Sequence, residues 1–209
     1  MSQATDSRSK TDRARRLRAA FRDAGGFNLV ELMVTITLIS ILMAIGVPSY
    51  RYVTNSNRVA TEVNSLLGDM MAARSEAIRQ GLPVTICPSD DGATCKDTTH
   101  WENGWILFSD FNADGAVDAA PPQNDTIVRY QTKFANAGGN NGDQFVATNL
   151  VNNWVTFNRD GFATNLNTNG TIHALFKLTT NPTNSQWTRC LEVQMAGQMT
   201  TEHAGTGAC

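Results

Sequence analysis

Hydrophobic and polar residues follow two different patterns along the chain, and the change falls near Gly81. Residues 27–47 form an apolar run in which Glu31 is the only charged residue. At about 1.5 Å per residue, a helix of this length spans about 31 Å, close to the thickness of a bilayer's hydrocarbon core. We therefore predict a transmembrane segment over residues 27–48.

Beyond Pro48 apolar residues recur every three or four positions, which is typical of an amphipathic helix. The stripe comprises Val59, Val63, Leu66, Met70, Ala73 and Ala77, and Leu67, Met71 and Ile78 widen it. Much of the remainder is polar: Arg58, Glu62, Asp69, Arg74, Glu76 and Arg79. Gly81 and Pro83 should stop the helix. The predicted helix runs from Phe27 to about Gln80, bends near Gly46 and Pro48, and packs residues 49–80 on a globular domain.

After Gly81 the pattern changes to short apolar or alternating runs separated by turn-rich stretches, which predicts strands. These runs are residues 84–87, 105–108, 127–130, 154–157, 174–178 and 190–193. No helical period lies between them, so consecutive strands should pair mostly antiparallel. The sequence thus predicts an α+β protein, with a long N-terminal helix packed on a small β-rich domain of residues 81–209.

Charge is distributed unevenly. Residues 1–26 carry seven basic and three acidic side chains, whereas the rest of the chain has a net charge of −6. A basic stretch before an apolar segment should stay cytoplasmic. We therefore expect a single-pass protein of the inner membrane, with residues after Pro48 in the periplasm. The globular part has no excess of cations that would attract nucleic acid.

All four cysteines lie beyond the apolar segment, which suits two disulfides in an oxidising compartment. Proximity in sequence favours the pairs Cys87–Cys95 and Cys190–Cys209, although four cysteines allow three pairings. A zinc site is the weaker interpretation, since the chain has no Cys-x-x-Cys and its histidines lie at no ligand spacing.

Glu31 is the residue that an ordinary membrane anchor does not explain. A lone carboxylate costs about 2.5–3.5 kcal/mol at the centre of a membrane helix and less toward its end. The apolar segment offers no partner, so one must come from another chain or from a new terminus. An ordinary secretory signal does not fit either, because the apolar region is too long and no Ala-x-Ala site follows it.

The sequence Gly26-Phe27-Asn28-Leu29-Val30-Glu31 resembles the cleavage motif of type IV prepilins. The resemblance implies that a prepilin peptidase cuts after Gly26, removes residues 1–26 as a leader and methylates the new amine of Phe27. The charged amine of one subunit could then pair with Glu31 of a neighbour. Pro48 matches a proline that is common in this superfamily.

The second half of the chain is similar to the GspH/FimT group of pseudopilins and minor pilins. The likeness is carried by Cys87-Pro88, Cys95, Trp101-x-x-Gly104-Trp105, Phe108-x-Asp110-x-Asn112-x-Asp114-Gly115, Phe157-x-x-Asp160-Gly161 and Arg189-Cys190. It implies the pilin-like fold, with other pilin subunits and an inner-membrane assembly platform as partners.

Asp110, Asn112, Asp114 and Asp118 lie in a D-x-N-x-D-G-x-x-D stretch. Oxygen ligands at alternate positions, with Gly115 sixth, resemble the start of a calcium-binding loop, but Pro121 stands where the closing carboxylate would be. The alternative is a tight turn in which Asp and Asn side chains bond the backbone. We favour the turn and keep a weak calcium site as the second interpretation.

No motif for hydrolase, metalloprotease or nucleotide chemistry occurs, so we do not expect an enzyme. The tryptophans should serve mainly as core residues. Some FimT-like proteins take up DNA through a Gly-Arg-x-Arg element, but the matching residues here are Gly197-Gln198-Met199-Thr200, so we do not expect DNA binding. We expect a FimT/FimU-like minor pilin near the pilus tip that helps to prime assembly. A type II secretion pseudopilin is the alternative.

Overall fold

A computed structural model describes residues 26–138, 142–166, 173–207 and 209. The chain divides into two compact units, residues 1–51 and 52–209. Helix α2 (Leu29–Gln80) belongs to both, since its N-terminal residues lie in the first unit and the others in the second. The described β-strands all lie in the second unit.

Local chemistry sets both ends of α2. The side chain of Asn28 accepts a hydrogen bond from the Val30 amide at 3.3 Å, which caps the free donors of the first turn. At the other end, Gly81 has a φ of 69°, and its amide donates to the Ala77 carbonyl at 2.9 Å. Glycine adopts this conformation without steric cost, so the helix ends there. Pro48 lies inside α2, and the bend expected near it stays a prediction.

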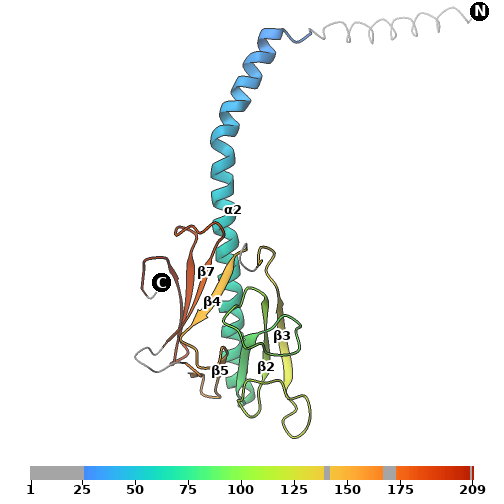
Figure 1. The fold of residues 1–209 in the computed structure, drawn as a ribbon, viewed down its shortest axis with the longest axis vertical. Coiled ribbons are helices and arrows are strands. Elements are labelled where there is room, and N and C mark those ends of the chain that lie inside the picture. The colour runs from blue at the N-terminus through green and yellow to red at the C-terminus, as the bar shows by residue number, and fades with distance from the viewer. Residues whose placement is uncertain (1–25, 139–141, 167–172, 208) are drawn as a thin grey trace, which may run out of the picture. The chain divides into compact units, whose positions relative to one another are not determined.

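Two antiparallel sheets make up the rest of the second unit. The first comprises β1 (Val84–Pro88), β2 (Gly104–Ser109), β3 (Thr126–Thr132), β5 (Val155–Phe157) and β6 (Ala163–Thr164), in the order β3-β2-β1-β5-β6. The second comprises β4 (Gln144–Thr148), β7 (His173–Thr179), β8 (Arg189–Gln194) and β9 (Met199–His203), in the order β4-β7-β8-β9. Figure 1 shows the C-terminal half of α2 with β2 and β3 to one side and β4 and β7 to the other.

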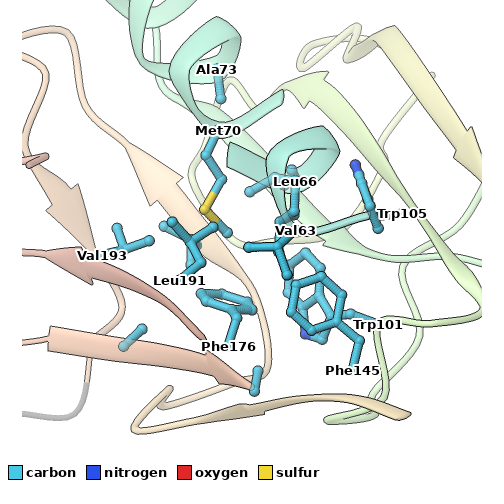
Figure 2. Packing of buried hydrophobic residues seen from close by; sticks show 14 of the residues in the cluster. Val63, Leu66, Met70, Ala73, Trp101, Trp105, Phe145, Phe176, Leu191 and Val193 are labelled. Atoms are coloured by element: carbon cyan, nitrogen blue, oxygen red, sulfur yellow. The ribbon is translucent and has the colours of Figure 1, made fainter. Parts of the chain in front are cut away.

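The apolar stripe of α2 forms the centre of the core. Leu66, Met70 and Ala73 are fully buried. Figure 2 shows these residues between Trp101, Trp105 and Phe145 on one side and Phe176, Leu191 and Val193 on the other. The edge of Phe176 meets the ring of Trp101, with centroids 4.9 Å apart. The stripe is therefore buried by both sheets, as the helical period predicts.

The observed fold confirms the predicted class, but it corrects the limits of the stripe. Met71 and Ile78, which the sequence places on the buried face, are 58% and 53% exposed. Conversely, Glu62 and Asp69, which the sequence places among the polar positions, are 8% and 5% exposed. All six predicted strands occur, and the sequence analysis missed β4, β6 and β9.

Candidate assembly surface and buried acids

The prepilin-like motif spans the start of α2. Gly26 and Phe27 precede the helix, and Phe27 is 77% exposed. The helix contains an 18-residue window with a mean hydropathy of 2.3, and no residue of that window is buried. By length and composition this helix can cross a membrane. The predicted leader lies outside the described residues except for Gly26.

Glu31 differs from the other polar residues of this apolar segment. The hydroxyl groups of Thr35, Thr37 and Ser40 each donate to a carbonyl oxygen one turn earlier, at 2.7–3.0 Å. Glu31 is exposed in the first turn, and it has no hydrogen-bond or ion-pair partner in the described part of the chain. The helix dipole favours an acid at this end. Within the described ranges, no group of the chain therefore binds this carboxylate.

Asp69 is an acid of the same helix whose partners come from its own chain. Trp105 donates its indole N–H to one carboxylate oxygen at 2.8 Å, and Arg129 donates to the other. Because Trp105 is buried, this bond satisfies a donor that would otherwise be costly. In the sequence, Asp69 lies seven residues after Glu62 and one position before the stripe residue Met70. Seven residues are about two helical turns, so this spacing was the available sign that both acids lie beside the buried stripe.

Glu62 lies in a second buried cluster with Arg58 and Asp143. Arg58 donates to Glu62 at 3.3 Å and also to Asp143, which accepts a further bond from the Asn181 amide at 3.2 Å. Burial raises the pKa of Glu62, Arg58 lowers it, and the negative charge of Asp143 raises it further. The net pKa is raised, and among the described residues Oε2 of Glu62 has no hydrogen-bond partner. Two carboxylates therefore share one arginine.

The structure brings the residues of the predicted calcium loop together in a turn. Asp110, which is fully buried, accepts hydrogen bonds from the Thr85 hydroxyl at 2.7 Å and from the Gly115 amide at 3.0 Å. Asn112 donates its amide to Asp114 at 2.8 Å and to Asp118 at 3.4 Å. Burial raises the pKa of Asp110, although the bonds from Thr85 and Gly115 oppose it. These contacts are those of the turn that we favour.

Metal binding at this loop stays a prediction. In the described ranges, no group of three or more His, Cys, Asp or Glu side chains is arranged to hold a metal ion. Both carboxylate oxygens of Asp110 already accept hydrogen bonds from backbone amides. A calcium ion would therefore have to compete with the bonds that shape the turn.

Two disulfides join the cysteines in the pairs that proximity favours. Cys87 bonds to Cys95 with Cα atoms 5.5 Å apart, and Cys190 bonds to Cys209 with Cα atoms 5.7 Å apart. Both separations lie in the usual range. The second bond ties the residues after β9 back to β8.

Of the four residues matched to the DNA-binding element of FimT-like proteins, Gly197 and Gln198 lie in the turn between β8 and β9, and Met199 and Thr200 begin β9. Gly197 has a φ of 72°, and its amide donates to the Gln194 carbonyl at 2.8 Å. The guanidinium of Arg74 donates to the carbonyl oxygens of Gly161 and Ala196, at 3.0 and 3.4 Å. The cation near this turn thus comes from α2 and is bound to backbone, a contact that the sequence analysis missed.

A long N-terminal helix whose second half packs between antiparallel sheets defines a pilin-like protein. A family model described as "Type II transport protein GspH" matches residues 62–197, so the chain belongs to the GspH family. A search of curated proteins gives no match.

Two solved structures illustrate the likeness. The crystal structure of the type IV minor pilin FimU from Pseudomonas aeruginosa is similar with a TM-score of 0.50 and 18% identity, over 75% of this chain and 95% of that chain. The minor pseudopilin EpsH from the type 2 secretion system of Vibrio cholerae gives a TM-score of 0.45 and 11% identity, over 71% and 98%. The matching family and the FimU likeness thus give this chain the GspH family and a pilin-like fold.

Proposed function

We propose that this chain is a minor pilin of a type IV pilus, located close to the tip, where it helps to prime assembly. The observation that carries the proposal is Glu31, an acid without a partner in the described structure, inside the exposed apolar first half of α2. An intramembrane acid normally pairs with another group. A neighbouring subunit that has been cut after Gly26 supplies that group as the amine of its Phe27.

Processing and topology complete the proposal. A prepilin peptidase cuts after Gly26 and methylates the amine of Phe27, and residues 27–48 hold the subunit in the inner membrane with its globular unit in the periplasm. An assembly platform then transfers the subunit into the filament. Because Glu31 pairs with a neighbour ahead of it, the subunit is not the outermost one.

Replacing Glu31 with Ala tests the pairing role. Thr37→Ala is the matched control, because the Thr37 hydroxyl is satisfied within its own helix at 2.8 Å. We expect Glu31→Ala to remain in the membrane fraction, be cleaved normally and be lost from sheared filaments, while Thr37→Ala is incorporated. Immunoblots of the two fractions and intact mass measure this. Equal incorporation of both variants would exclude the pairing role.

The second candidate function is a pseudopilin of a type II secretion system, which the description of the matching family favours. Deleting the gene separates the two functions. A minor pilin predicts loss of surface pili with secretion unchanged, whereas a pseudopilin predicts that folded proteins accumulate in the periplasm while pili persist. Complementation with the wild-type chain must restore the lost activity.

A further inference from the structure

The outer edge of β9 is an open strand edge. The amide of Gln194 donates to the Gln198 carbonyl at 2.9 Å, and the amide of Ala204 donates to the Thr188 carbonyl at 3.4 Å. Together with the regular register between β8 and β9, these bonds fix which residues face β8. The N–H and C=O groups of Met199 and Thr201 therefore point away from the sheet. In the described ranges neither residue has a backbone partner on that side.

Two of the other three sheet edges are covered. Residues 99–101 hydrogen-bond along the free side of β4, and the amide of Ala163 in β6 donates to the Met195 carbonyl at 2.9 Å. The edge strand β3 differs from β9, because its register with β2 shifts between Leu107 and Phe108, and such irregularities discourage strand pairing. The edge of β9 has a continuous register with β8.

Two cavities flank this edge on the side that faces α2. One, of about 410 Å³, lies between Met71 and Ile78 of the helix and residues 197–199. The other, of about 250 Å³, lies between Asn64 of the helix and the residues Arg189, Thr201, Glu202 and His203 of the sheet. Met71, Ile78 and Met199 give the first cavity its apolar surface, and Met71 and Ile78 are the two stripe residues that are unexpectedly exposed.

The second cavity is lined by one arginine, Arg189, and by one acidic residue, Glu202. Arg189 donates to the carbonyl oxygens of Gln186 and Thr188, at 2.9 and 3.0 Å. Among the described residues, no carboxylate lies within ion-pair distance of its guanidinium. An incoming carboxylate would therefore gain a charged hydrogen bond that the chain itself does not supply.

We propose that β9 accepts an extended peptide strand from a different pilin subunit of the filament, which adds to the sheet beside α2. The strand bonds to the backbone of Met199 and Thr201, places an apolar side chain against Met71 and Ile78, and directs an acidic side chain to Arg189. Because alternate residues of a strand share a face, these two side chains are an even number of positions apart. The inference rests on the proposed function, since it names a surface through which the assembled subunit binds a neighbour.

Photocrosslinking in cells that assemble the filament tests the contact directly. p-Benzoylphenylalanine replaces Thr201, whose side chain faces the cavity, or Thr200, whose side chain lies on the opposite face of β9. We expect an adduct from position 201 that maps to an extended segment of a different pilin subunit, with none from position 200. An adduct between two copies of this chain, or with the apolar helix of a neighbour, would overturn the proposal.

Lysine substitutions provide the second measurement. Thr201→Lys places a charge in the path of the incoming strand, whereas Thr200→Lys adds the same charge to the other face. We expect Thr201→Lys to be lost from sheared filaments and Thr200→Lys to be retained, with both variants showing the wild-type tryptophan melting curve. If Thr201→Lys does not fold, the photocrosslink from position 201 still tests whether a strand of another subunit lies beside β9.

The outcomes separate the two proposals. If the wild-type chain is absent from filaments, the proposed function fails. If the wild-type chain is present and position 201 behaves like position 200 in both experiments, the proposed function stands and the strand contact is wrong.

Discussion

The two halves of α2 differ in whether their acidic residues are bound by groups of the described chain. In the second half, Glu62 and Asp69 are buried and bound by Arg58 and Arg129 of the same chain. In the first half, Glu31 is exposed and has no partner among the described residues. One helix thus serves two purposes, because its second half completes a domain core whereas its first half leaves both apolar surface and an acid for other molecules.

The largest expected effect comes from a matched pair of leucines. Leu66 is fully buried in the second unit, whereas Leu38 is 55% exposed in the first. We expect Leu66→Ala to lower the free energy of unfolding by about 3–4 kcal/mol, because it leaves a cavity in the core. Leu38→Ala should leave that free energy unchanged. All four tryptophans lie in residues 52–209, so thermal melting of the full chain in detergent, followed by tryptophan fluorescence, reports on the second unit.

Equal destabilisation by the two leucine substitutions would contradict the division of α2. It would mean that the first half of the helix also stabilises the globular core. Unchanged melting of Leu66→Ala would instead show that the stripe is not the centre of that core.

Removal of the second disulfide should have a somewhat smaller effect. The bond between Cys190 and Cys209 joins residues 19 apart, and a loop of this size contributes about 3 kcal/mol in the chain-entropy model. The variant with both cysteines changed to Ala should melt at a lower temperature but keep its membrane insertion. Non-reducing peptide mapping of the wild-type chain provides the control, and a Cys87–Cys190 peptide would show that the pairing is wrong.

The smallest effect concerns the buried acid Glu62 and its dependence on pH. Because its pKa is raised in the folded chain, its contribution to stability is complete below about pH 4.5 and is lost as the pH rises through the folded pKa. Asp143 and Arg58 are the charged groups that face it. The side chain introduced by Glu62→Gln cannot ionise. As the pH rises from 4.5 to 7, we therefore expect the wild type to lose free energy of unfolding relative to this variant. Melting curves across this range measure the difference, and parallel curves would contradict the shift.

Local pattern was sufficient to predict most of the fold. The helical period of Val59 to Ala77 and the turn chemistry of Gly81 depend only on neighbouring residues, so the sequence shows them directly. The strands with several consecutive apolar residues were found for the same reason. β9 was missed because Met199-Thr-Thr-Glu-His203 has little apolar character, although it adds regularly to β8.

The sites depend on contacts that no local pattern contains. Arg58 and Asp143 are 85 residues apart, and Asp69 and Arg129 are 60 apart, so a single sequence gives no sign that they meet. The exposure of Met71 and Ile78 likewise depends on where the sheets end around the helix. By contrast, the Glu31 hypothesis came from the sequence because its physical cost is evident from the apolar residues around it.

The pairing of β1 has a consequence for the order in which the globular unit forms. Its neighbours in the sheet are β2 and β5, and Ile86 of β1 pairs with Val155 of β5 across some seventy positions of chain. The strands β7, β8 and β9 instead follow one another as a meander, whose contacts close short loops and form quickly. During synthesis from the N-terminus, the second half of α2 and β1 are complete before their later partners in the chain exist. A growing chain therefore exposes the apolar stripe until the C-terminal meander has been made, and this is the interval in which a chaperone has the most to protect.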